Sequence, residues 1–311
     1  MNYKINLKTS LNKELKRILN EQMEDSLQQL TDKEKETDVS VHEFRKNMKK
    51  SRAVLRLMRH NVKKESYREM NSLFRDLSKR LGRSREAKVH LDTLEEIMSE
   101  NELPKTAGSL YDYFQQEYDE TLQNLKDNEN VLNDTIKKLQ QARQKIHKLS
   151  MDDDDTYLIY HGIKKVYKRG RKALTVVYEF PGGENFHEWR KRAKYLWYIC
   201  LLLEEIWPEV MIGYITSLDV LSDYLGKEHD LFELQNIILE RQDLNFIPEK
   251  DRQIIANVID KYRTTIQCKA RPVGSKLYFE KPKMFAKRII HYRSVEMAKI
   301  NSGSEKTNLI L

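Results

Sequence analysis

A five-residue block occurs twice in this chain, and this repeat limits the possible folds more than any other feature of the sequence. The block from His42 to Lys46 (HEFRK) recurs from His187 to Lys191 (HEWRK), at an offset of 145 residues. A second marker keeps almost the same spacing, since Leu81-Gly82 recurs as Leu225-Gly226 at an offset of 144. Each Leu-Gly pair is predicted to form a turn before another helix. Two markers in one order and at nearly one offset indicate two homologous halves.

Long helices are predicted for both halves, because helix-breaking residues are rare. Only 10 glycines and 6 prolines occur in 311 residues, among many Leu, Lys, Glu, Gln and Arg residues, which favour helices. Apolar side chains three and four apart in residues 67–81 and 110–125 follow the buried face of a helix. Strand-like alternation is scarce, so we predict an all-α fold. The acidic run at 152–155 is predicted to be a solvated loop between the halves.

The basic charge of the chain is concentrated in three short segments. The net charge of the whole chain is +8, yet residues 41–60 alone carry seven Lys or Arg against one Glu. Residues 161–172 carry six basic residues and no acid, and residues 187–194 carry four against one Glu. The rest of the chain is therefore acidic, and the basic segments are predicted to form a binding surface.

Each basic segment places its charges on one face of a helix. His42, Arg45, Lys49, Arg52 and Arg56 are spaced by three and four, as residues on one helical stripe are. The second copy aligns His187, Arg190, Lys191 and Lys194, and the segment that begins at His161 aligns its lysines in the same way. Three cationic faces that converge would repel one another. Their convergence therefore predicts an anionic ligand.

The residue types favour phosphoryl groups as that ligand. Arg binds phosphoryl oxygens with two hydrogen bonds, Lys acts as a point charge and His donates from its ring. A protein that binds nucleic acid usually exposes aromatic side chains for base stacking, whereas Phe44 and Trp189 are predicted to lie in the core. P-loop, nucleophile-elbow and zincin motifs are absent, and the basic stripes lack carboxylates for a catalytic magnesium. We therefore expect binding without catalysis, metal or cofactor.

These motifs together resemble those of the CHAD family, the conserved histidine α-helical domain. The resemblance rests on the two His-x-x-Arg helices, on the Leu-Gly pairs followed by Arg85-Glu86 and His229-Asp230, and on the late block from Glu280 to Phe285. It implies two four-helix bundles related by a pseudo-two-fold axis, whose central basic surface binds inorganic polyphosphate. The resemblance also implies targeting to polyphosphate granules, as in several members of the family. The chain resembles a member that lacks the catalytic CYTH domain.

We expect the CHAD domain at residues 10–295, with halves at about 10–150 and 156–295, and a flexible tail at 298–311. The expected polyphosphate ligands are the basic residues of the three segments and of the two Leu-Gly markers. They are His42, Arg45, Lys46, Lys49, Lys50, Arg52, Arg56, Arg83, Arg85, His161, Lys164, Lys165, Lys168, Arg169, Arg171, His187, Arg190, Lys191, Lys194 and Lys227.

The remaining expectations concern location and alternative functions. The chain lacks a membrane-spanning apolar stretch and a secretory signal, so we expect a cytoplasmic protein that is associated with granules. Cys200 and Cys268 are expected to be buried, reduced thiols. The alternatives are a helical protein that binds nucleic acid and a scaffold whose basic face docks an acidic partner. A hidden phosphatase is the least favoured, and the oligomeric state is not predicted.

Overall fold

The structure is all-helical, as predicted from the sequence. This computed structural model describes residues 3–32, 34–151 and 154–303, and none of them forms a strand. The elements are α1 (Leu11–Thr31), α2 (Thr37–Met58), α3 (Lys64–Arg80), α4 (Arg83–Glu100), α5 (Thr106–Asp127), α6 (Glu129–His147), α7 (Asp155–Glu179), α8 (Gly183–Leu202), η1 (Glu204–Ile206), α9 (Pro208–Glu240), η2 (Gln242–Leu244), α10 (Glu249–Leu277) and α11 (Pro282–Gly303).

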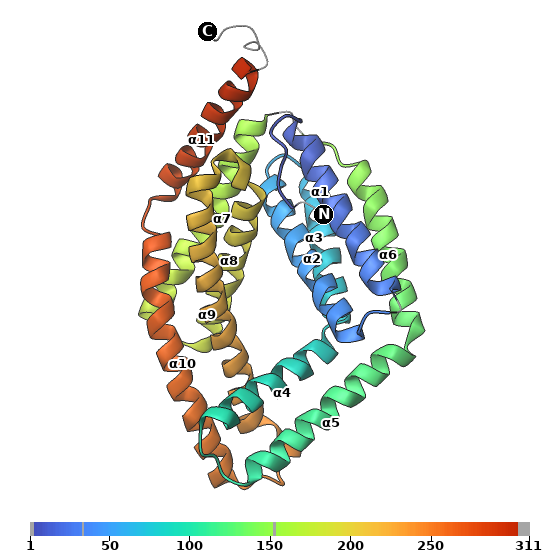
Figure 1. Cartoon of the computed structure of the whole chain (residues 1–311), viewed down its shortest axis with the longest axis vertical. Coiled ribbons are helices and arrows are strands. Elements are labelled where there is room, and N and C mark those ends of the chain that lie inside the picture. The colour runs from blue at the N-terminus through green and yellow to red at the C-terminus, as the bar shows by residue number, and fades with distance from the viewer. Residues whose placement is uncertain (1–2, 33, 152–153, 304–311) are drawn as a thin grey trace, which may run out of the picture.

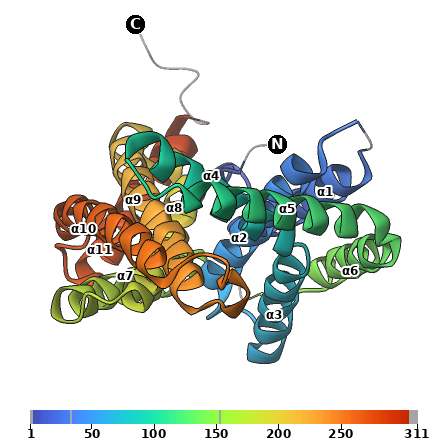
Figure 2. The ribbon, with the colours of Figure 1, turned by 90° about the horizontal axis from the view of Figure 1, so that it is seen from below.

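Two groups of helices stand side by side, and two further helices cross the lower end of the molecule. Figure 1 shows α1, α2, α3 and α6 in one group and α7 to α11 in the other, with α4 and α5 running across below them. Seen from below in Figure 2, α4 extends across the space between the two groups. The helix order of the first half largely recurs in the second, which fits an internal duplication.

The second Leu-Gly marker does not form the turn that we predicted from the first. Leu81 and Gly82 separate α3 from α4, whereas Leu225 and Gly226 lie inside the 33-residue helix α9. A glycine weakens a helix without ending it, and apolar residues on both sides of Gly226 hold α9 against α8 and α10. One continuous helix therefore replaces the pair α3 and α4.

The apolar side chains form two separate cores. The larger core joins both halves, with Phe44, Trp189 and Phe186 fully buried in it. The smaller core lies at the lower end, where Phe114 of α5 packs with residues of α4, α9 and α10. The larger core thus spans both halves, and the smaller core joins α4 and α5 of the first half to α9 and α10 of the second.

A glycine brings the two halves into close backbone contact where α7 crosses α2. A Cβ atom added at Gly162 would lie 2.3 Å from the carbonyl oxygen of Leu57. No side chain fits in that space, because a backbone oxygen cannot move aside as the end of a flexible side chain can. Gly162 therefore sets how closely α2 approaches the second half, and α2 carries the first cationic stripe.

Three smaller expectations are modified by the structure. Asp154 caps α7, with its side chain accepting a 2.8 Å hydrogen bond from the Tyr157 amide, whereas Asp152 and Asp153 lie outside the described residues. The expected tail starts within α11, which continues to Gly303, and residues 304–311 are outside the described part. Cys200 is buried as predicted, but Cys268 is exposed because it lies on the outer face of α10. No described helix is long and apolar enough to cross a membrane.

Candidate functional site

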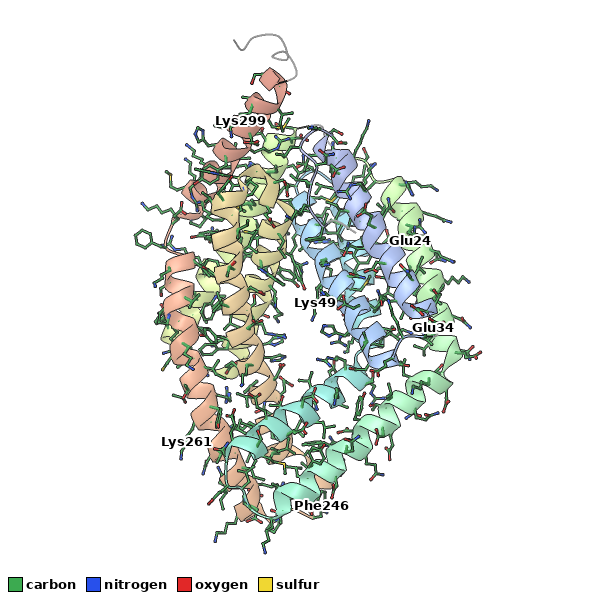
Figure 3. The ribbon with its side chains drawn as sticks, viewed as in Figure 1. Glu24, Glu34, Lys49, Phe246, Lys261 and Lys299 are labelled. Atoms are coloured by element: carbon green, nitrogen blue, oxygen red, sulfur yellow. The ribbon has the colours of Figure 1, made fainter. Side chains whose placement is uncertain are left out.

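The two copies of the repeated motif face each other across the space between α2 and α8. Lys49 points from α2 into that space, as Figure 3 shows. Arg45 of α2 and both Arg190 and Lys194 of α8 lie close enough to influence its charge. The central site, as we define it, comprises His42, Arg45, Lys49, Arg85, His187, Arg190, Lys194, His229 and Asp230.

Lys49 is the residue on which the crowding of positive charge is clearest. Its side chain is accessible to water, but protein surrounds it on several sides. This partial burial, followed by the charges of Arg190, Arg45 and Lys194, lowers the pKa of Lys49 to about 7. An ammonium group is normally charged far above neutral pH. The neighbouring cations thus disfavour protonation of Lys49, and an anion bound at the site would favour it.

The histidines of the central site are uncharged imidazoles at neutral pH. Nδ1 of His187 and Nδ1 of His229 are 2.9 Å apart, so that one ring donates a hydrogen bond to the other. Burial and then the charge of Arg190 lower the pKa of His229 to about 3, and burial also lowers the pKa values of His42 and His187. These rings therefore serve as neutral hydrogen-bonding groups.

Carboxylates also reach the central site, and they offset part of its positive charge. Burial raises the pKa of Asp230, although the charges of Arg190, Lys49 and Arg85 act in the opposite direction. Arg45 lies 3.4 Å from Glu86 and donates to the carbonyl of Ser78, and Arg85 lies 3.3 Å from Asp38. The motif arginines are thus oriented by contacts with neighbouring elements before any ligand arrives.

A second group of arginines continues the α2 stripe toward the upper end of the helix. We call Arg52, Arg56, Arg169 and Arg192 the arginine cluster. Arg56 is only 8% exposed, and its guanidinium group lies 3.6 Å from the centre of the Tyr195 ring. It donates to the Arg52 carbonyl at 2.8 Å and forms no ion pair within the described residues. Burial lowers the pKa of Arg56 to about 10, which marks a second place where an anion would be stabilised.

Several of the expected ligands are paired with other residues or lie outside these two groups. Lys46 binds Glu43, Lys191 binds Glu188 and Lys227 binds Glu96. Lys50 lies over the ring of Tyr3 and Lys164 over that of Tyr160. The rings of His161 and Tyr157 are tilted toward each other with their centres 4.1 Å apart, and the His161 ring also lies near that of His60. Arg83, Lys165 and Lys168 are exposed, and Arg171 lies near Tyr167 on another face of α7.

Reasoning from the sequence missed three residues of these groups. His229 and Asp230 follow the second Leu-Gly marker and contribute to the family resemblance, but neither was expected to be a ligand. Arg192 directly follows the second repeated block, where it pairs with Glu188 at 2.7 Å and lies near Arg169. The first copy has Asn47 at the equivalent place, so comparing the two copies could not reveal the role of Arg192.

Comparison with known proteins finds one family and one fold. The family model described as CHAD domain matches residues 18–238. No curated protein of similar sequence is found. The fold resembles that of PptA from Streptomyces chartreusis, with a TM-score of 0.63 and 11% identity over 88% of this chain and 100% of that one. It also resembles the CHAD domain from the plant Ricinus communis, with a TM-score of 0.60 and 12% identity over 88% and 93% of the two chains.

Proposed function

Because this chain belongs to the CHAD domain family, whose model matches more than two thirds of its length, we propose that it binds inorganic polyphosphate at the central site without hydrolysing it. One observation carries the proposal. Arg45 and Lys49 from the first half meet Arg190 and Lys194 from the second. Burial, together with the charges of these three neighbours, lowers the pKa of Lys49 to about 7. A linear polyanion that passes between the halves would relieve this repulsion along its whole path.

The surroundings of the aromatic residues favour polyphosphate over a nucleic acid. Proteins that bind single-stranded nucleic acids stack the bases on exposed aromatic rings. Here Arg56 covers Tyr195 at 3.6 Å, Lys194 lies 4.2 Å from the centre of Trp197, and Arg59 lies 5.1 Å from that of Tyr67. The rings nearest the basic groups are therefore already occupied by cations, and oxygens and charge are the features that remain for recognition.

Calorimetric titration tests this function directly. The purified protein is titrated near physiological salt with long-chain polyphosphate, with RNA at equal phosphate concentration and with orthophosphate. We expect tight binding of polyphosphate alone, with an affinity that decreases steeply as salt rises because bound counterions are released. Equal or tighter binding of RNA would move the protein to the nucleic-acid binders, and no binding of any of the three would favour an acidic protein partner.

Binding without turnover fits a cytoplasmic protein that is recruited to polyphosphate granules or that regulates an enzyme of polyphosphate metabolism. A fluorescent fusion distinguishes the two roles. A granule protein would colocalise with stained polyphosphate and disperse in cells that lack the polymer. A regulator would instead change the rate of a polyphosphate-metabolising enzyme in vitro. Orthophosphate release in the presence of added metal would contradict the non-catalytic part of the proposal.

Lys49 should make the affinity for polyphosphate depend on pH. Its free pKa is about 7, and a bound polyanion favours the ammonium form and so raises that pKa. Binding is then at full strength below pH 7 and weakens as pH rises above it, by about tenfold per unit until the bound-state pKa is reached. Dissociation constants measured from about pH 6 to pH 9 check this. Lys49→Arg should flatten the profile, because Arg stays protonated, and an unchanged profile in that variant would exclude Lys49 as the titrating group.

A further inference from the structure

The two motif glycines occupy different surroundings. A Cβ atom at Gly82 would lie 2.0 Å from Nη1 of Arg45, so in the first half the glycine makes room for the motif arginine. A Cβ atom at Gly226 would have one neighbour within 4 Å, Nε of Arg190 at 3.9 Å. Glycine is an unfavourable residue inside a helix, and no packing contact requires it at this position of α9. The surface of Gly226 instead faces a cavity.

This cavity, the Gly226 cavity, has a volume of about 280 Å³ and walls from α4, α8 and α9. Two of the groups that line it lack a hydrogen-bond partner among the described residues. The hydroxyl of Ser222, a residue only 1% exposed, has none, and neither has the buried Nε of Arg190. Both groups can donate, and a buried donor without a partner is costly. An acceptor, such as a phosphoryl oxygen, is therefore expected in the cavity.

The charges around the cavity are balanced, unlike those around Lys49. Three cations line it, namely Arg190, Lys194 and Lys227, and three carboxylates line it as well, namely Glu96, Asp223 and Asp230. Glu96 is paired with Lys227, whereas Asp223 and Asp230 form no ion pair within the described part of the chain. They lie on the same face of α9 as Gly226, three residues before it and four after it. A bare phosphoryl group in the cavity would be repelled by both carboxylates.

A phosphoryl group that carries a divalent cation would satisfy both sets of charges. Magnesium is commonly held by one or two carboxylates together with phosphate oxygens, and it keeps several of its waters. We propose that the Gly226 cavity binds one phosphoryl group of polyphosphate together with its magnesium ion. Arg190 and Ser222 donate to the phosphoryl oxygens, and Asp223 and Asp230 hold the magnesium ion or its waters.

This inference rests on the proposed function and adds a metal requirement to it. Among the described residues, no three His, Cys, Asp or Glu side chains are grouped closely enough to hold a metal ion. The phosphoryl oxygens must therefore complete the coordination, and magnesium is expected to bind with the polymer and not before it. The cations elsewhere in the central site, such as Arg45 and Lys49, supply binding that does not need magnesium.

The test is calorimetric titration of the full chain with polyphosphate at constant ionic strength, with and without magnesium chloride. For the natural protein, we expect magnesium to tighten binding by about threefold or more, since it bridges ligand and carboxylates. Asp223→Asn with Asp230→Asn removes the repulsion and the metal ligands together. That double variant should bind more tightly than the natural protein without magnesium and should be weakened by magnesium, which then only competes with the protein cations.

Two further variants separate the cavity from general electrostatics. Asp119→Asn with Asp127→Asn removes the same charge from exposed positions on α5, and it should keep the natural response to magnesium. Gly226→Leu fills the cavity and should abolish the gain from magnesium without lowering the thermal midpoint, because Leu favours a helix. Magnesium that weakens binding equally in the natural protein and in the Asp223→Asn, Asp230→Asn variant would overturn the inference. Absence of any polyphosphate binding would instead overturn the proposed function.

Discussion

Replacing Arg45 and Arg190 together by alanine is expected to lower the affinity for polyphosphate by roughly a hundredfold to ten-thousandfold. Each arginine would donate charge-assisted hydrogen bonds worth about 1.5–3 kcal/mol, and every 1.4 kcal/mol corresponds to about a factor of ten. The two side chains come from equivalent positions of the repeat and act on the same charge, that of Lys49. Titration calorimetry measures the loss, and circular dichroism checks that the helical content is unchanged.

The matched control removes two arginines that lie outside both basic groups. Arg75 is paired with Asp76, and Arg143 is paired with Glu24 at 2.5 Å. Surface pairs of this kind contribute little, so the Arg75→Ala, Arg143→Ala variant should bind within about threefold of the natural protein. An equal loss of affinity in the two double variants would mean that polyphosphate binding depends on net charge alone and not on the central site.

Replacing Arg263 by methionine should destabilise the protein by about 3–5 kcal/mol, the usual effect of leaving a buried charge without its partner. Glu228 is fully buried, and it accepts hydrogen bonds from Nη2 of Arg263 at 2.9 Å and from Gln267 at 3.0 Å. This pair joins α9 to α10, directly before His229 and Asp230 of the central site. Urea unfolding of the two proteins measures the difference in free energy of unfolding.

The pH dependence and a second variant show whether the buried charge is the cause. Burial already raises the pKa of Glu228, and Arg263 opposes that shift. Without Arg263 the pKa rises further, so the folded state binds a proton more readily than the unfolded state, and stability falls as pH rises. The loss should therefore be smaller near pH 5 than near pH 8. Glu228→Leu with Arg263→Met should recover part of it, and a double variant no more stable than Arg263→Met would indicate lost packing instead.

Much of the fold was predictable because its signals are local. The three-and-four spacing of apolar residues predicts helices wherever it occurs, and the described residues confirm an all-helical chain. The repeated block identified the arginines and lysines that the two halves bring to the central site. The same comparison failed at Leu225-Gly226, because a glycine ends a helix only when the surrounding packing does not hold the helix together.

The central site was only partly predictable, because the position of a charged residue along a helix does not show which neighbouring residue it pairs with. Lys46 and Lys49 lie three residues apart, yet Lys46 is bound to Glu43 while Lys49 faces Arg190. Asp223 and Ser222 carry no sequence signal at all. They belong to the Gly226 cavity only because α4 crosses in front of α9 and brings Glu96 to Lys227.

The sequence by itself determined the helices, the family and the residues that carry the positive charge, and its repeated block indicated a duplication. Each of these depends on identity and spacing along the chain, and periodicity within one helix is enough to define a face. The tertiary structure alone decided which of those charges remain unpaired and that the larger core contains residues of both halves. It also decided that carboxylates line the Gly226 cavity beside the cations. Those properties depend on the distances between helices far apart in the sequence, which are set by close packing at contacts such as Gly162 against Leu57.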